Sequence, residues 1–571
     1  MTVWSSRERG EASDVNLSRA QTLGMGVMVQ VDRAFAFYVL GRAAFGATPN
    51  SLEELQSLGF TAWVDEQLKP RPGLDVATDK YLRNARLHIK YPAGEGWAAV
   101  DEMRPLTTLD APIATLWHLV DHKNPMHAAE RRRPRDEVVA ATVLRAVHSR
   151  WQLREVMCGF WHDHFNVDAA NEAIGVALPS YDRDVIRTHC FGNFREFLEA
   201  VAKSAAMQYY LSNRSSRAGS ANENYARELF ELHSMGRSAY LNDQYDRWRE
   251  VPGALQGRPA GYIDQDVYEA ARAFTGWTIE DGSAVDAHRK LPPTGQFAYV
   301  ENWHDGYQKR VLATEFDAFA PALSDGRQVL DLVAAHPATA HFLCDKLCRR
   351  FIGEEVPARL RQRLAEVWLK NTESHDQIAR VLRTLLMSRE FLVSGAAAPG
   401  AAAPAAASPG AAAPGAKTRR PLALAAAFAR AMQIDLKYSE QLGGEIAAAG
   451  QNLFGWPTPT GLPDAAAPFL SSQAMRHRWS LVLGLAENNW STGAIADPKA
   501  LGLAQPTTLG ATSALLNNLI GSAPAATVAA IVTGCGWPAD QALNAAGAGE
   551  AAHRWSRLAA YCAMAPDFQV N

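Results

Sequence analysis

The chain has 571 residues, more than a single hydrophobic core usually serves, so two or three domains are expected. Hydrophobic residues make up 47% and charged residues 20% of it, which is typical of a soluble globular protein with a large core. The net charge of −3 gives no electrostatic case for nucleic-acid binding, which requires a strongly basic face.

The N-terminus and the hydropathy pattern bear on where the protein is located. The stretch that begins Met1-Thr2-Val3-Trp4 lacks the basic and then apolar order of a signal peptide. No apolar run is long enough to span a membrane. The expectation is therefore a cytoplasmic protein. A different start site, or export together with a partner, would place it in the periplasm or outside the cell.

Apolar residues recur with a helical period along most of the chain. This predicts a mainly α fold, with a large multi-helix domain, long loops and few short strands. Residues 1–30 are polar and lack the period, so they are expected to form a disordered arm. A helix is expected to start with Ser51 as its N-cap and Glu54 as the acid of a capping box. Longer helical patterns cover residues 136–160, 193–211, 264–275, 326–350 and 374–391.

Residues 161–168 contain a His-x-His pair whose meaning depends on the backbone conformation. If the preceding helix continues, His164 lies on the inward apolar face and His162 points away. If the chain becomes extended instead, a period of two places His162, His164, Asn166 and Asp168 on one face. That ladder of nitrogen and oxygen ligands would suit a divalent metal ion. The sequence leaves both conformations open.

Residues 222–236 predict a helix with an unusual number of ionisable groups on one side. At about 100° per residue, an arc of roughly 140° contains Asn224, Glu223, Arg227, Glu228 and Glu231. The opposite face is apolar and wide, so the helix is expected to be mostly buried and its polar arc partly desolvated. Carboxylates buried beside an arginine form either a structural ion-pair network or a functional site. On a straight helix His233 points about 140° or more away from Glu228 and Glu231, so it cannot bind one ion together with them.

Residues 395–416 are almost only Ala, Pro, Gly and Ser, and prolines recur every five positions from 399 to 414. Such spacing breaks an alanine helix and predicts an extended, flexible insertion. The main helical domain is then expected at 31–394. Residues 417–571 are expected to form a second, Ala-rich helical part.

Several stretches, in this order along the chain, resemble the bacterial family called domain of unknown function 1800 (DUF1800). They are residues 38–49, 59–68, 160–165, 192–195, 222–236, 266–277, 304–306, 336–340, 450–454 and 459–464. Because stretches on both sides of the Ala/Pro-rich segment take part, the resemblance implies that 395–416 is a loop insertion and that 417–484 packs on the main domain.

The resemblance implies a large, mostly helical bacterial protein, and the activity of this family is not established. Its members are often encoded beside proteins that resemble alkaline phosphatases and sulfatases, and some carry export signals. The first hypothesis is therefore a scaffold or maturation partner of a phosphatase/sulfatase-like companion protein. In that function the charged residues of the 222–236 helix form a buried network that fixes the fold.

The alternative hypothesis is a metal-dependent enzyme with its site between the 161–168 segment and the 222–236 helix. Hydrolytic and oxidative chemistry would both fit such a site. Its residues would be the metal ligands His162, Asp163 and His164, the ligands or general bases Glu228 and Glu231, and Arg227, which would pair with a substrate anion or a carboxylate.

Overall fold

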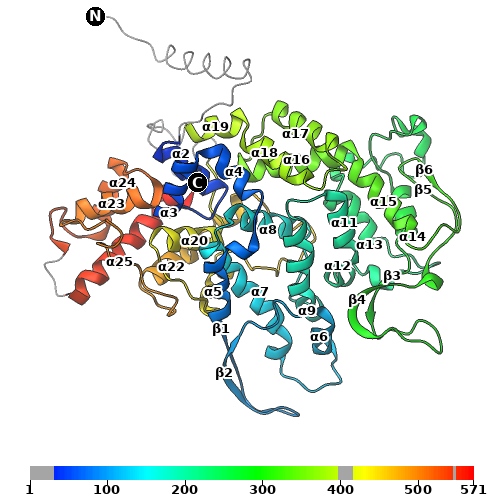
Figure 1. Cartoon of the computed structure of the whole chain (residues 1–571), viewed down its shortest axis with the longest axis horizontal. Helices are drawn as coiled ribbons and strands as arrows, with labels where there is room; N and C mark the ends of the chain where they lie inside the picture. The colour runs from blue at the N-terminus through cyan, green and yellow to red at the C-terminus, as the bar shows by residue number, and fades with distance from the viewer. Residues whose placement is uncertain (1–30, 397–415, 544–547) are drawn as a thin grey trace, which may run out of the picture.

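The computed structural model describes residues 31–396, 416–543 and 548–571, and within these ranges the chain is mainly helical, as predicted (Figure 1). The described strands form three separate two-stranded antiparallel sheets. The predicted arm at 1–30 and most of the predicted insertion at 395–416 lie outside the described residues. Within the described ranges, every helix is too short or too polar to cross a bilayer.

The N-terminal helices are α2 (Arg33–Arg42), α3 (Pro49–Leu58), α4 (Phe60–Gln67) and α5 (Val76–Asn84). The predicted N-cap of α3 is wrong, because Thr48 rather than Ser51 caps the helix. The Ser51 amide donates to Thr48 Oγ1 at 3.0 Å, and the Thr48 amide donates to Ser51 Oγ at 2.8 Å. Pro49 fits the first helical position because its fixed φ suits a helix and its missing N–H would be unpaired there.

The middle of the molecule is built around α7 (Ala128–His148) and α8 (Gln152–His164). The single pattern predicted at 136–160 covers two helices, because the backbone turns at Ser149, whose hydroxyl donates to Asp75 at 2.7 Å. The elements around this pair are the hairpin β1 (Arg86–Tyr91) and β2 (Val100–Pro105), α6 (Ile113–Leu116), α9 (Glu172–Ser180), the π-helix η3 (Tyr181–Ile186), α10 (Arg187–His189), α11 (Phe194–Lys203) and α12 (Ala205–Tyr210).

The segment predicted as one helix at 222–236 has two parts. Helix α13 (Asn224–Glu228) runs directly into the π-helix η5 (Leu229–His233). A π-helix holds more residues per turn than an α-helix, so the straight-helix angles no longer apply beyond Glu228. His233 is nevertheless buried at 1% exposure, as expected for a residue on the core side.

The right part of Figure 1 holds α14 (Asp264–Ala273), β3 (Trp277–Asp281), β4 (Pro293–Tyr299), β5 (Lys309–Val311), β6 (Thr314–Phe316) and α15 (Ser324–Ala335). The chain then runs back along the top of the view through α16 (Pro337–Phe351), α17 (Ala358–Lys370), α18 (Gln377–Leu386) and α19 (Arg389–Ala396), which packs against α2. The C-terminal part begins with α20 (Pro421–Ala431), α21 (Glu440–Ala448) and α22 (Ser472–Ala486), and ends with α23 (Thr508–Ile520), α24 (Ala525–Cys535), α25 (Ala548–Met564) and α26 (Pro566–Gln569). Helices α23, α24 and α25 lie at the left of the view.

Helix α20 brings the C-terminal part of the chain to the centre. It packs against α7, and its buried Arg430 donates to the carbonyls of Gly46 at 3.0 Å and Val147 at 2.7 Å. Just before α20, Thr418 forms a β-bridge with Val570. Arg420, the residue that precedes α20, pairs with Asp163 of α8 and so places the start of α20 beside that helix.

Candidate functional site

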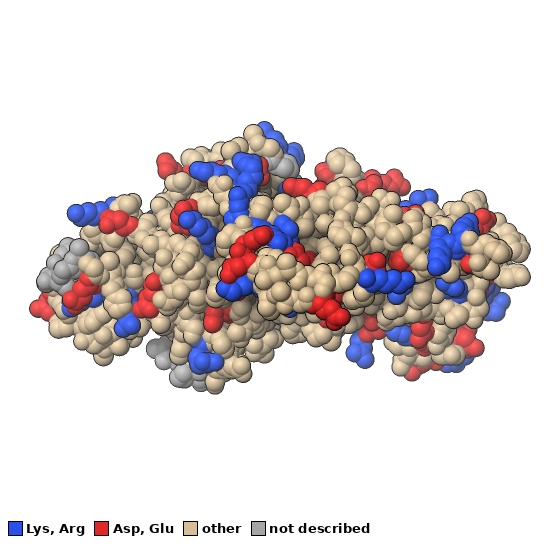
Figure 2. All heavy atoms as spheres, turned by 90° about the horizontal axis from the view of Figure 1, so that it is seen from below, with Lys and Arg blue, Asp and Glu red and all other residues tan. Residues whose placement is uncertain are grey.

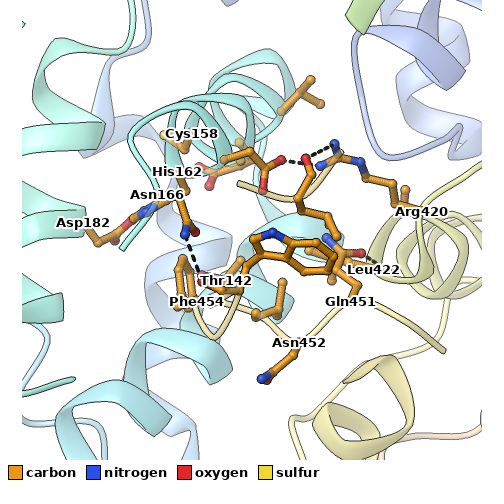
Figure 3. Close-up of a pocket in the computed structure, with 18 of the residues that line it drawn as sticks. Thr142, Cys158, His162, Asn166, Asp182, Arg420, Leu422, Gln451, Asn452 and Phe454 are labelled. Atoms are coloured by element: carbon orange, nitrogen blue, oxygen red, sulfur yellow. Dashed lines mark hydrogen bonds and ion pairs between the residues drawn. The ribbon is translucent and has the colours of Figure 1, made fainter. Parts of the chain in front are cut away.

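A cavity of about 80 Å³ lies where α8, η3, the start of α20 and the segment 451–462 meet (Figure 3). One water needs at least roughly 10–15 Å³ of such space, so the cavity can hold several waters or a small ligand. Asn166 joins the walls, because its Nδ2 donates to the carbonyls of Trp456 and Thr458, each at 2.9 Å. Gln451 accepts a hydrogen bond of 2.9 Å from the amide of Leu422 in the first turn of α20.

Helix α8 continues to His164, so the extended ligand ladder considered from the sequence does not form. His162, Asp163 and His164 are consecutive on this helix, and each contacts a different set of partners. Successive side chains on an α-helix point about 100° apart. The three candidate ligands therefore do not converge on one point.

His162 faces the cavity and is held by a buried carboxylate. Its Nε2 lies 3.0 Å from Asp182 Oδ1, and its ring meets the Phe454 ring edge-on at 4.7 Å (Figure 3). Arg145 donates to the other oxygen of Asp182 at 3.2 Å. Burial alone would raise the pKa of Asp182, but the charge of Arg187, the His162 hydrogen bond and the charge of Arg145 outweigh it and hold this pKa well below its usual range. Asp182 is therefore ionised at neutral pH.

Arg187 and Glu155 form a second buried pair in the cavity wall. The Arg187 guanidinium donates to both oxygens of Glu155, at 2.9 and 2.5 Å. This is the two-pronged geometry in which arginine binds a carboxylate most strongly. The pair shapes this part of the wall, and the charge of Arg187 also acts on Asp182.

Asp163 faces a different group of charges, at the start of α20. It accepts a hydrogen bond from Arg420, which also donates to the carbonyls of Leu462 at 3.3 Å and Pro463 at 3.2 Å. Asp464 follows directly and lies 2.9 Å from Lys417 Nζ and 3.6 Å from Arg420 Nη2. Burial raises the pKa of Asp464, but the neighbouring cations outweigh burial and lower it to about 2.

His164 lies on the core side of α8 and uses both ring nitrogens there. Lys346 Nζ donates to Nδ1 at 2.9 Å, so Nε2 carries the proton and donates to the carbonyl of His233 at 3.1 Å. Burial, followed by the charge of Lys346, lowers the pKa of His164 well below its usual range. A neutral His164 with both nitrogens occupied has no lone pair left for a metal ion.

The candidate bases Glu228 and Glu231 lie in a different part of the structure, on α13 and η5. Arg227 pairs with Glu223 at 3.3 Å and with Asp264 at 3.5 Å, and Glu231 lies 3.9 Å from Arg237. Burial and then the charge of Glu231 raise the pKa of Glu228 to about 7.

Among the described residues, His162 forms a hydrogen bond with Asp182 and ring contacts with Tyr181 and Phe454. None of these three residues belongs to α13 or η5. In the described part of the chain, no group of three or more His, Cys, Asp and Glu side chains is arranged to hold a metal ion. The metal site stays a prediction that this geometry does not support.

The sequence does not show which charged residues meet in this site. Asp182 meets its partners only through tertiary packing, and so does Asp464, although it belongs to the stretch 459–464 of the family resemblance. Arg420 is an exception, because it stands at the N-cap of α20, where the helix dipole disfavours a cation and where no side-chain cap is formed. A cation in that position indicates that a carboxylate or another anion lies nearby.

Comparison with protein families identifies the family to which the chain belongs. The family model described as Protein of unknown function (DUF1800) matches residues 38–570, which include every wall of the cavity. Neither the curated proteins nor the solved structures gave a match. Since the matched region covers nearly the whole chain, the protein belongs to the DUF1800 family.

Proposed function

We propose that this chain is an enzyme in which His162 acts as the general base toward a small molecule bound in the central cavity. The observation that carries the proposal is the 3.0 Å hydrogen bond between His162 Nε2 and Asp182 Oδ1 in the cavity wall. A histidine that is oriented by a buried carboxylate and opens onto a ligand-sized cavity is the arrangement that general acid–base catalysis uses.

Asp182 determines which nitrogen of His162 acts. The ionised carboxylate accepts the Nε2 proton, so the lone pair of the neutral imidazole lies on Nδ1, which is not hydrogen-bonded to any described residue. A proton from a bound water or a substrate hydroxyl moves to Nδ1 and produces an imidazolium. Asp182 stabilises this positive charge without taking the proton, because Arg145 and Arg187 favour its ionised form.

The proposal is tested by exposing the purified protein to a defined mixture of small metabolites and following their consumption by mass spectrometry. Wild-type protein is expected to convert at least one compound. His162→Gln is expected to lower the rate by roughly 10²–10⁴, the usual contribution of general base catalysis, and Asp182→Asn to lower it in the same direction. His477→Gln is the matched control, because His477 forms a similar pair with Glu445 at 3.3 Å outside the cavity.

Conversion of the same compounds at the same rate by His162→Gln would refute the assignment. The assignment would also be refuted if wild-type protein converts none of the compounds although near-ultraviolet circular dichroism shows that it is folded.

The second candidate is the scaffold or maturation partner of a phosphatase/sulfatase-like companion, inferred from the family resemblance. The observation in its favour is that Asp163 and Arg227 are bound into ion pairs, with Arg420 and with Glu223 and Asp264. In a scaffold, Asp163→Asn would lower stability and abolish maturation of the companion, while His162→Gln would change neither. The metal-dependent alternative would require α8 to unwind so that His162 and His164 share one face.

A further inference from the structure

Two of the six cysteines contact each other beside the central cavity. All six are free thiols. Cys158 lies on α8 and Cys190 directly follows α10, and these two buried thiols are hydrogen-bonded to each other. The Cys190 thiol in turn donates to the carbonyl of Arg187 at 3.5 Å. The chemistry proposed above for His162 uses neither thiol.

The backbone around the two cysteines is held by contacts of its own. Trp161, on the turn of α8 that follows Cys158, donates from Nε1 to the carbonyl of Cys190 at 3.0 Å. The π-helix η3, which leads into α10, packs against α8. A disulfide has its sulfurs about 2.05 Å apart and its Cα atoms within about 7 Å of each other. Thiols that are already in contact need far less movement to reach this geometry than thiols that must first meet.

Cys158 is the member of the pair that reaches the cavity. It lines the cavity of about 80 Å³, whereas Cys190 is not among the lining residues (Figure 3). Cys158 and His162 are one turn apart on α8, so they share a face of this helix. Hydrogen peroxide is little larger than water, and the cavity has room for several waters. An oxidant of this kind therefore meets Cys158 first.

Nearby cations favour the thiolate, which is the reactive form of cysteine. The hydrogen bond from Cys158 lowers the pKa of Cys190. The charges of Arg154 and Arg187 act in the same direction, and together these effects outweigh burial and the charge of Glu155. Burial raises the pKa of Cys158, so Cys190 is the first of the two to lose its proton. On the face drawn in Figure 2, acidic and basic side chains are interspersed, so the positive charge at the thiols comes from the neighbouring arginines and not from a broad basic surface there.

We propose that Cys158 and Cys190 form a reversible redox pair beside the cavity, which a small peroxide converts into a disulfide. The disulfide would link α8 covalently to the end of α10, and an external dithiol would reduce it again by thiol–disulfide exchange. This inference goes beyond the proposed function, because it does not require His162 to act as a base.

The oxidation takes place in two steps once the Cys190 thiol has released its proton to water. The Cys158 sulfur attacks one oxygen of the peroxide while the Cys158 proton passes to Cys190 along their hydrogen bond. The O–O bond breaks and the departing hydroxide takes up the released proton, so one water forms and Cys158 becomes a sulfenic acid. The Cys190 sulfur then attacks the Cys158 sulfur, the S–O bond breaks, and the hydroxide leaves with the Cys190 proton as the second water. The two thiols lose two electrons, and the peroxide is reduced to two waters.

Peptide mass spectrometry of the full chain after treatment with a small excess of hydrogen peroxide tests the inference. The remaining thiols are alkylated during denaturation, and the peptides are analysed without reduction. Wild-type protein is expected to form the Cys158–Cys190 disulfide at least tenfold faster than Cys344 and Cys348 are oxidised, and dithiothreitol is expected to restore both thiols. Cys344 and Cys348 are the matched control pair, because they are buried one turn apart on α16 and neither lines the cavity.

Two results with wild-type protein would overturn the inference, and neither depends on a variant that must fold. One is that Cys158 and Cys190 stay free while the peroxide is present. The other is that the control pair on α16 is oxidised as fast, which would mean unspecific oxidation of a loosened chain. Cys190→Ser tests the order of attack: Cys158 is expected to stop at the sulfenic acid, which dimedone traps. A Cys190→Ser protein that dimedone does not label would contradict attack at Cys158.

Discussion

Replacing Glu228 with glutamine should stabilise the protein above neutral pH. Glu228 ends α13 in a half-buried position, and its neighbour Glu231 carries the same charge. Arg227, the nearest cation, pairs with Glu223 and Asp264 instead. The Glu228 carboxylate thus loses water without gaining a cation of its own, and its pKa rises from 4.5 to about 7.

The sign and size of the effect follow from this pKa. A raised pKa means that the folded state binds the proton more tightly than the unfolded state, so stability falls between pH 4.5 and about 7 and then stays level. One pKa unit corresponds to about 1.4 kcal/mol, which sets a ceiling of roughly 3.4 kcal/mol. Glu228 is only partly buried, and solvent screening reduces the expected effect to roughly 1–2 kcal/mol.

Urea denaturation of wild type and Glu228→Gln at pH 5 and at pH 8 measures the difference. The variant is expected to be more stable by roughly 1–2 kcal/mol at pH 8 and by much less at pH 5, where Glu228 is protonated in the folded state. Glu223→Gln is the control, because Glu223 has a cationic partner and should lose stability on substitution. A Glu228→Gln protein that is less stable than wild type at pH 8 would refute the reasoning, since the charged carboxylate would then have a favourable partner, such as a metal ion.

Three further substitutions test other parts of the structure. Asp464→Asn removes the carboxylate that pairs with Lys417, Arg350 and Arg420 and is expected to destabilise the fold by about 3 kcal/mol in urea. Because the pKa of Asp464 is lowered from 3.8 to about 2, this difference should persist above pH 4 and vanish as the pH falls to about 2. Elemental analysis of wild type and His164→Ala checks the metal prediction, and a stoichiometric metal that His164→Ala removes would contradict the contacts of His164 described above. Thr48→Ala should cost about 1 kcal/mol as the loss of an N-cap, measured by the same urea titration, and an unchanged midpoint would contradict the cap assignment.

The periodicity of the sequence predicts where helices occur better than where they break. The pattern at 326–350 is two helices, α15 and α16, joined at His336, which ends the first and caps the second. Pro337 is compatible with a first helical turn, so the apolar period continues across the junction without a visible interruption. The π-helices η3 and η5 are likewise invisible in the sequence, because one inserted residue shifts the helical period without removing it.

Half of the cavity could be located from the sequence, and the other half could not. His162 and Asp163 stand out because ionisable residues cluster in a short stretch. Their partners come from elsewhere in the chain. The packing of η3 against α8 brings Asp182 to His162, and the packing of α20 against α7 accompanies the pairing of Arg420 with Asp163, which are 257 residues apart. Long-range pairs of this kind leave no local pattern, although a cation at the start of a helix is a usable indication that an anion lies close by.

The two histidines of α8 differ in whether a ring nitrogen is free to bind a ligand, and helix geometry is the reason. They are two positions apart, so their side chains point about 200° apart around the helix, toward the cavity and toward the core. On the core side, Lys346 and the His233 carbonyl occupy both nitrogens of His164 and keep it neutral. On the cavity side, Asp182 occupies only one nitrogen of His162, which leaves the other available to a ligand. A substitution at His164 should therefore act through stability and one at His162 through chemistry, and the two histidines must be changed separately to distinguish an enzyme from a scaffold.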